Sequence, residues 1–155
     1  MLQYDLIDTD HATLASAYVL FNELGVESHI EFITQRVGRL TVLLNAQNEI
    51  EMTFPNQKPE AVATVPPALF NGLSKKPIYD FVSRYFWPAN GGDEDPVTGS
   101  IHAGLAPYWA EKLNKPDLVA YQASKRGGIL KCRVSETTVV VSGKGVLYLK
   151  GKINI

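Results

Sequence analysis

Apolar side chains occupy nine of the fourteen positions from residue 11 to residue 24, and Gly25 follows directly. A run of this length that ends at a glycine is typical of a helix, and Thr9 or Asp10 would cap its start. The apolar positions surround the helix instead of forming one stripe, which indicates that other structure covers it on several sides. We therefore predict a central, buried helix close to the start of the chain.

Alternating apolar and polar positions predict strands in most of the remaining chain. After the first helix, strands are expected at residues 29–34, 39–45 and 50–54, with residues 46–48 forming a hairpin turn. Further strands are expected at residues 79–87, 118–123, 128–134, 138–142 and 146–153. The fold class that follows from this order is α+β with mainly antiparallel strands.

The segment between Pro55 and Pro77 differs in character. Its prolines interrupt any long regular element and leave room only for a short helix near residues 68–73. We interpret residues 59–78 as a connector between a first half, residues 1–58, and a second half, residues 79–155. Both halves combine one mostly apolar helix with strands, which suggests two similar units, although the residues themselves show no strong repeat.

Residues 92–100 predict a loop that turns directly into the second apolar helix. Asp95 is suited to capping the first backbone N–H groups, and Pro96 fits the first helical position. Gly99 would let a ligand approach the backbone, and Ser100 adds a hydroxyl beside it. Open N–H groups at a helix start attract a carboxylate or a phosphate, although Asp95 argues against a purely electrostatic phosphate site. Alternatively, Asp95 only caps the helix, and this helix start binds no ligand. Pro107 is expected to kink or restart this helix.

The composition narrows the functional classes. The 155 residues are 45% hydrophobic and 20% charged, with a formal net charge of −1, which is typical of a globular protein and gives no indication of nucleic acid or an anionic membrane as a partner. No apolar run is long enough to span a bilayer, and the acidic start does not resemble a signal peptide, so a cytoplasmic location is expected. The single cysteine, Cys132, excludes an internal disulfide and argues against a zinc site.

Several segments, taken in order, resemble the phenazine-biosynthesis-like (PhzF-like) isomerases. They are residues 11–17, 80–86, 94–100, 105–109 and 122–128. The resemblance implies a diaminopimelate-epimerase-like fold, in which mixed and antiparallel strands form barrels around two central apolar helices. It also implies that the starts of these helices face each other across a cleft.

The same resemblance implies the chemistry. Members of this family move a proton on a small carboxylated metabolite without a metal or an organic cofactor. His11 would match the family's active-site histidine, and Asp95 and Ser100 would match the aspartate and serine of the second helix start. Together with Thr98 and Gly99, Ser100 is expected to bind the substrate, and its hydroxyl and the Gly99 N–H would hold the substrate carboxylate. His11 and Asp95 would then be the catalytic residues of an isomerase or epimerase.

The chain also departs from the family pattern. Family members are longer, and the leading segment with their acid/base glutamate has no counterpart before His11. Thr9 and Asp10 replace the Cys-Gly pair that precedes the family's histidine, and a second block is expected to be absent between Leu73 and Tyr79. A second function therefore stays open beside the isomerase: a non-catalytic protein of this fold that serves as a small-molecule binder or an assembly module.

Other side chains have simpler interpretations. His102 is expected to pack inward with one hydrogen bond, and Cys132 to be a buried, inert thiol in a strand. Glu94 is expected to be a solvated loop acid. Arg126 lies in a predicted turn, where it is either solvated or able to reach an anion.

The predicted strands also bear on assembly. Each half has too few strands to close a barrel around its own helix, so a helix face or sheet edges would be left open. We therefore expect a homodimer in which equivalent halves of two chains cover one another. The alternative is a single rearranged domain of about eight strands that holds both helices.

Overall fold

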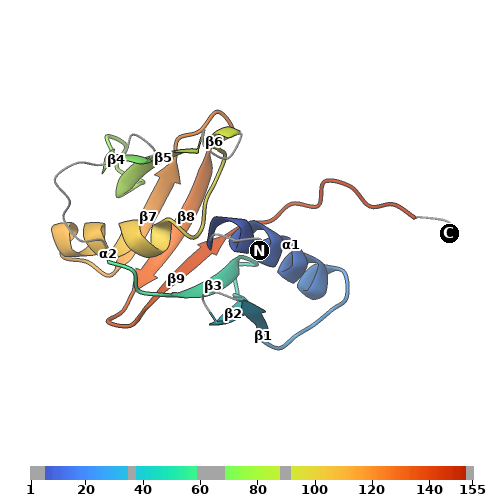
Figure 1. The fold of residues 1–155 in the computed structure, drawn as a ribbon. Helices are drawn as coiled ribbons and strands as arrows, with labels where there is room; N and C mark the ends of the chain where they lie inside the picture. The colour runs from blue at the N-terminus through green and yellow to red at the C-terminus, as the bar shows by residue number, and fades with distance from the viewer. Residues whose placement is uncertain (1–5, 35–37, 59–68, 88–91, 153–155) are drawn as a thin grey trace, which may run out of the picture.

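A computed structural model describes residues 6–34, 38–58, 69–87 and 92–152. These residues form one nine-stranded sheet and two helices (Figure 1). The elements are α1 (Leu6–Asn22), β1 (Ile30–Thr34), β2 (Gly38–Leu44), β3 (Ile50–Pro55), β4 (Leu69–Leu73), β5 (Phe81–Trp87), β6 (Gly92–Asp95), α2 (His102–Leu113), β7 (Asp117–Gln122), β8 (Gly128–Val134) and β9 (Thr138–Gly143).

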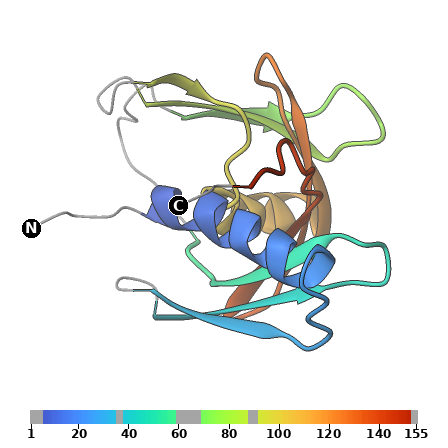
Figure 2. The ribbon, with the colours of Figure 1, turned by 90° about the vertical axis from the view of Figure 1, so that its right-hand side faces the viewer.

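The strands follow the order β1-β2-β3-β9-β8-β7-β5-β4, and β6 pairs with β5. Every pairing is antiparallel except that between β5 and β7, which is parallel. The pairing of β3 with β9 joins strands from early and late parts of the sequence into one sheet. Figure 2 shows the sheet curving around the two helices, from β1–β3 on one side to β4–β6 on the other.

The expected barrel is wrong for this chain. The described strands leave β1 and β4 at opposite ends of the sheet, and no described strand joins them. The sheet is therefore curved but open. The coarser expectation, an α+β fold dominated by a sheet that packs against two helices, is confirmed.

One face of the sheet carries the core. Paired positions place Val42, Met52, Val141, Cys132 and Leu118 in a row across β2, β3, β9, β8 and β7, and all five side chains are buried. Helix α1 packs on β1–β3 and α2 packs on β7–β9. Buried residues of both helices belong to the same hydrophobic cluster as this row, so the two helices share one core.

Helix α2 continues through Pro107 instead of ending there. Proline has no N–H, so the carbonyl group of Ala103 loses its helical donor. The backbone N–H of Gln57 donates to that carbonyl oxygen at 3.3 Å. The segment after β3 therefore replaces the missing helical bond and attaches to α2 at this point.

Both helices begin elsewhere than predicted. Helix α1 begins at Leu6, so Thr9 and Asp10 lie inside it and do not cap it. Its first turns carry acidic residues, which the helix dipole favours, and the apolar pattern extends back to Leu6. Helix α2 begins only at His102, because Asp95 is the last residue of β6 and pairs with Tyr85 of β5.

Two further predictions are corrected. Residues 69–73, expected to be helical, form strand β4 and pair with β5, whose edge supplies backbone partners. Gly72 also disfavours a helix at this position. Residues 146–150, expected to form a strand, run extended without a strand partner among the described residues; we call them the C-terminal arm. Residues 59–68 of the connector and Ile153 lie outside the described residues.

Candidate active site

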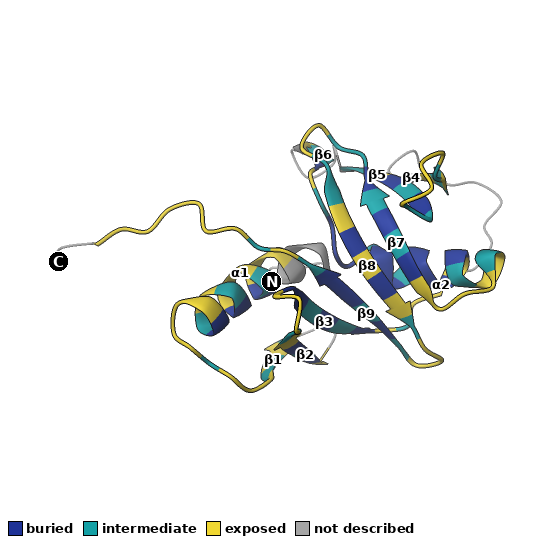
Figure 3. Cartoon of the chain, turned by 180° about the vertical axis from the view of Figure 1, so that it is seen from behind, coloured by how far each residue is buried: buried dark blue, intermediate teal, exposed yellow. Residues whose placement is uncertain are grey.

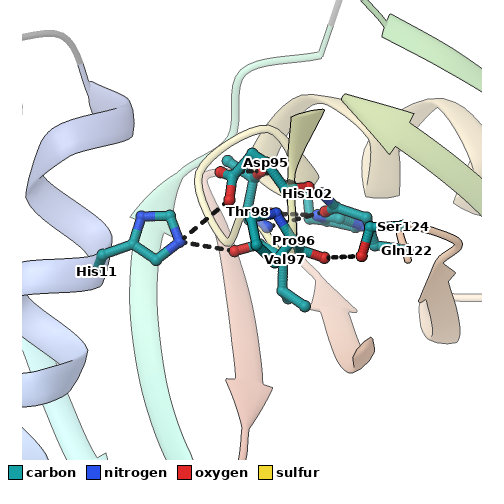
Figure 4. Close-up of polar contacts among 8 residues, drawn as sticks. All are labelled: His11, Asp95, Pro96, Val97, Thr98, His102, Gln122 and Ser124. Carbon is teal, nitrogen blue, oxygen red and sulfur yellow. Dashed lines mark hydrogen bonds and ion pairs between the residues drawn. The ribbon is translucent and has the colours of Figure 1, made fainter. Parts of the chain in front are cut away.

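Helix α1 contacts the loop after β6 through the side chain of His11 (Figure 4). Nε2 of His11 lies 2.8 Å from the carbonyl oxygen of Val97 and 3.6 Å from Oδ1 of Asp95. Because a carbonyl oxygen only accepts, Nε2 carries the hydrogen in this contact. The side chain of His11 is 52% exposed and that of Asp95 is 5% exposed. An accessible imidazole therefore rests against a buried carboxylate.

The other oxygen of Asp95 is held from within its own loop. The hydroxyl group of Thr98 donates to Oδ2 of Asp95 at 2.5 Å. The backbone N–H of Thr98 donates to Oε1 of Gln122 at 2.8 Å. Both donors of Thr98 are therefore used inside the protein, and in this arrangement Thr98 positions the carboxylate. A contact between Thr98 and a substrate stays a prediction.

Gln122 of β7 holds the loop that carries Asp95 and Thr98 in place. Its Nε2 donates to the carbonyl oxygen of Asp95 at 2.8 Å and to Oγ1 of Thr98 at 3.2 Å, in addition to the bond that Oε1 accepts. The side chain is fully buried. It occupies an inward position of β7, after Leu118 and Ala120 in the alternation. A polar residue at a core position is the signal that could have revealed this role from the sequence.

The β7–β8 hairpin holds the same loop at two more points. The hydroxyl group of Ser124 donates to the carbonyl oxygen of Pro96 at 2.6 Å and accepts from the backbone N–H of Gly127 at 3.0 Å. Val97 lies directly against Gly128, where a Cβ atom would stand 2.0 Å from Cγ2 of Val97. Residues 122–128, identified above by resemblance alone, thus form the support of the loop that carries Asp95.

His102 supports the loop from α2. Its Nδ1 lies 2.6 Å from the carbonyl oxygen of Thr98, so Nδ1 carries a hydrogen, and Nε2 accepts from the hydroxyl group of Ser83 at 3.4 Å. Burial lowers the pKa of His102 to about 4, which outweighs the raising effect of the bond to Thr98. The ring is therefore neutral at physiological pH, and the expectation of an inward histidine is confirmed. It makes two hydrogen bonds where one was expected.

The strand before the loop is tied to its neighbour by an ion pair. Arg84 of β5 donates from Nε and Nη2 to the two carboxylate oxygens of Glu94 in β6, at 2.7 and 3.0 Å. These bonds lower the pKa of Glu94 below its usual value. Glu94 is therefore not the solvated loop acid that the sequence suggested, because it holds β6 beside β5 directly before Asp95.

The residues ahead of α2 form a buried turn. Thr98, Gly99 and Ser100 are all buried, and the backbone N–H of His102 donates to the carbonyl oxygen of Gly99. Among the described residues, the N–H groups of Gly99 and Ile101 have no acceptor. Two backbone N–H groups at the N-terminal end of α2 are thus without an acceptor in the part of the chain that the structure describes.

The structure also places the two remaining residues that the sequence singled out, Cys132 and Arg126. Cys132 is buried in β8, as expected, and burial raises the pKa of its thiol to about 12. Arg126 is exposed in the β7–β8 turn. Within the described ranges, no group of three or more histidine, cysteine or acidic side chains is arranged to hold a metal ion. No helix in that part of the chain is long and apolar enough to cross a membrane.

Comparison with known proteins identifies the family. A family model described as phenazine biosynthesis-like protein matches residues 62–151. An uncharacterized isomerase of Halalkalibacterium halodurans is 34% identical over 192 residues, which cover 92% of this chain and 72% of the relative. The chain belongs to the phenazine biosynthesis-like family. The resemblance inferred from the sequence segments is therefore confirmed.

Two solved structures of proteins from this family are also similar to this chain. A phenazine biosynthesis PhzC/PhzF protein of Clostridium difficile has a TM-score of 0.77 and 36% identity, over 94% of this chain and 73% of that chain. A PhzF family protein of Enterococcus faecalis has a TM-score of 0.83 and 31% identity, over 94% and 72%.

The alignment to the Halalkalibacterium relative runs over 192 residues, more than the 155 of this chain. That relative thus contains internal residues without a counterpart here, as expected for a missing block. The position of the missing block, predicted between Leu73 and Tyr79, stays a prediction.

Proposed function

We propose that the protein is a cofactor-independent isomerase that moves a proton on a small carboxylated metabolite in a cytoplasmic biosynthetic process. The observation that carries this proposal is the contact of the exposed His11 imidazole with the buried Asp95 carboxylate, at 3.6 Å. A histidine beside a carboxylate is a common acid/base arrangement, because the carboxylate orients the ring and stabilises its protonated form.

The short distance favours an isomerase over an epimerase. An epimerase needs an acid/base group on each face of the reacting carbon, and reacting atoms lie about 3–3.5 Å from such groups. No carbon fits between Nε2 of His11 and Oδ1 of Asp95 at their present separation of 3.6 Å. The two side chains therefore act as one centre on one face of the substrate. One such centre is sufficient to remove a proton from one carbon and return it to another on the same face.

The turn ahead of α2 offers a place for the substrate carboxylate. The N–H groups of Gly99 and Ile101 have no acceptor among the described residues, and the positive end of the helix dipole adds to their attraction for an anion. Ser100, next to them in the chain, would contribute its hydroxyl group. The chemistry then needs only a carboxylate, an adjacent acidic C–H group and the His11–Asp95 pair.

Proton exchange in heavy water tests this proposal. The full chain is incubated in deuterium oxide with a panel of small hydroxy, amino and unsaturated carboxylic acids, and deuterium uptake at carbon is followed by NMR. We expect uptake with at least one acid, and its loss by a factor of about 10² to 10⁴ in both His11→Gln and Asp95→Asn.

His29→Gln is the matched control, because His29 is also exposed but lies before β1, outside the site. It should exchange like the unchanged protein. Exchange that survives His11→Gln would remove His11 from the chemistry. No uptake with any acid in the panel would favour the non-catalytic function, a binder or assembly module of this fold.

A further inference from the structure

The outer face of the sheet, away from the two helices, carries a hollow of about 300 Å³ that residues of β3, β9, β8 and β7 line. Part of this lining is one row of paired positions, in which Glu51 is opposite Ser142, Ser142 opposite Lys131, and Lys131 opposite Val119. These positions alternate with the buried row of the core, so their side chains point away from α1 and α2. Figure 3 shows this face of β7 and β8 with α2 behind it, and exposed and buried residues alternate along β8.

A buried hydroxyl group without a partner opens into this hollow. Ser142 is only 7% exposed, although it occupies an outward position of β9 and lines the hollow. In the part of the chain that the structure describes, its side chain forms no hydrogen bond. Buried polar groups in folded proteins are nearly always paired with protein, water or a ligand. The hydroxyl group of Ser142 is therefore available to a molecule that enters the hollow.

The charges around the hollow leave one carboxylate without a cation. Four carboxylates and three bases line it, and ion pairs occupy all three bases: Lys131 with Glu49, Lys115 with Asp80, and Arg133 with Asp117. The fourth carboxylate, that of Glu51, forms no ion pair among the described residues. Its Oε1 accepts from Nδ2 of Asn45 at 2.9 Å. Oε2 of Glu51 is therefore able to bind a cationic group.

Glu51 and Ser142 are close enough to bind the same group. They are directly opposite each other on β3 and β9, and the Cβ atoms of such a pair lie about 4.5–5.5 Å apart. Carboxylate and hydroxyl oxygens both accept hydrogen bonds, so a positively charged group with several N–H donors fits between them. Val119 and Val140, both half-buried, also line the hollow and offer apolar contact to an alkyl chain on that group.

We propose that the hollow is a second binding site, which takes the primary ammonium group of a small amine or amino acid. The carboxylate of Glu51 neutralises the ammonium group, and the hydroxyl oxygen of Ser142 accepts one of its N–H bonds. The candidate active site is held from the other face of the sheet, because Gln122 occupies an inward position of β7. The two sites are therefore separated by the sheet.

NMR titration of the full, isotopically labelled chain tests this proposal. The probes are propylamine, alanine and propionate, which carry the ammonium group alone, both charged groups, and the carboxylate alone. We expect propylamine and alanine to shift the backbone amide signals of Glu51, Lys131 and Ser142, with a Kd of about 1–10 mM. Propionate, and sodium chloride at the same ionic strength, should leave these signals in place. Tighter binding of alanine would identify an amino acid as the ligand, and tighter binding of propylamine a simple amine.

Two substitutions assign the binding groups. Glu51→Gln removes the charge but keeps the shape of the side chain, and it should weaken the binding of propylamine by about tenfold or more. Ser142→Ala removes one acceptor and should weaken binding by about threefold or more. Glu136→Gln is the matched control, because Glu136 is exposed in the β8–β9 turn outside the hollow, so its replacement should leave the affinity unchanged.

Three results would overturn the proposal. The first is the absence of any shift with propylamine and alanine up to about 50 mM. The second is equal binding of propionate, which would mean that the ammonium group is not recognised. The third is an affinity for propylamine that Glu51→Gln or Ser142→Ala leaves unchanged, because the binding groups would then lie elsewhere.

Discussion

Replacing Gln122 by Met is expected to lower the free energy of unfolding by about 3 kcal/mol. Methionine fills a similar volume but makes none of the bonds from Gln122 to Asp95 and Thr98. The carbonyl group of Asp95 and the N–H of Thr98 would then be buried without partners, and each such group costs about 1–3 kcal/mol. Urea unfolding followed by circular dichroism measures the change.

Gln47→Met is the control for this substitution. Gln47 is exposed in the β2–β3 turn, so its replacement should change stability by no more than about 0.5 kcal/mol. Equal effects of the two substitutions would mean that Gln122 does not hold the loop. The Gln122 variant should also lose the contact between His11 and Val97, because Val97 lies between Asp95 and Thr98, the two residues that Gln122 holds.

Replacing Gly128 by Ala is expected to destabilise the protein by about 2 kcal/mol, because the added methyl group overlaps with Val97. The new Cβ atom would stand 2.0 Å from Cγ2 and 3.1 Å from both Cγ1 and Cβ of Val97. The loop that carries Asp95 must then move away from β8. Thermal unfolding and the deuterium exchange described above report the two consequences, a lower midpoint and weaker exchange.

A second substitution separates this overlap from other causes. Val97→Ala removes both Cγ atoms, so the double variant Gly128→Ala, Val97→Ala should recover more than half of the lost stability. Gly72→Ala is the control in β4, where a Cβ atom meets nothing within 4 Å. A double variant no more stable than Gly128→Ala alone would contradict the close contact between loop and hairpin.

The strands were the most predictable part of the fold. Alternation placed β1, β2, β3, β5, β7, β8 and β9 close to their observed positions, because one face of each packs on the core and the other faces water. The parallel pairing of β5 with β7 was not predictable, since it brings together segments far apart in the sequence. The sequence predicted a helix where β4 lies, because this strand is stabilised by its pairing with β5 and its own residues show no clear alternation.

The site was predicted only in part. Asp-Pro before an apolar run is a common helix start, but Asp95 belongs to β6 because pairing with β5 and the bond from Thr98 hold it there. His11 was named from resemblance, and nothing in its local sequence indicated that it meets Val97. Gln122 was overlooked, although a polar residue in the inward row of β7 signalled it. The division into residues 1–58, 59–78 and 79–155 stays a prediction.

The contact between His11 and the loop at Asp95 is the feature on which the proposed chemistry depends. NMR of the imidazole resonances tests it, with His11→Gln for assignment and the exposed His29 as an internal reference. If the contact exists in solution, the His11 ring shows nuclear Overhauser effects to Val97, and its signals shift in Asp95→Asn while those of His29 do not. A His11 ring without such effects, unchanged by Asp95→Asn, would contradict the acid/base pair.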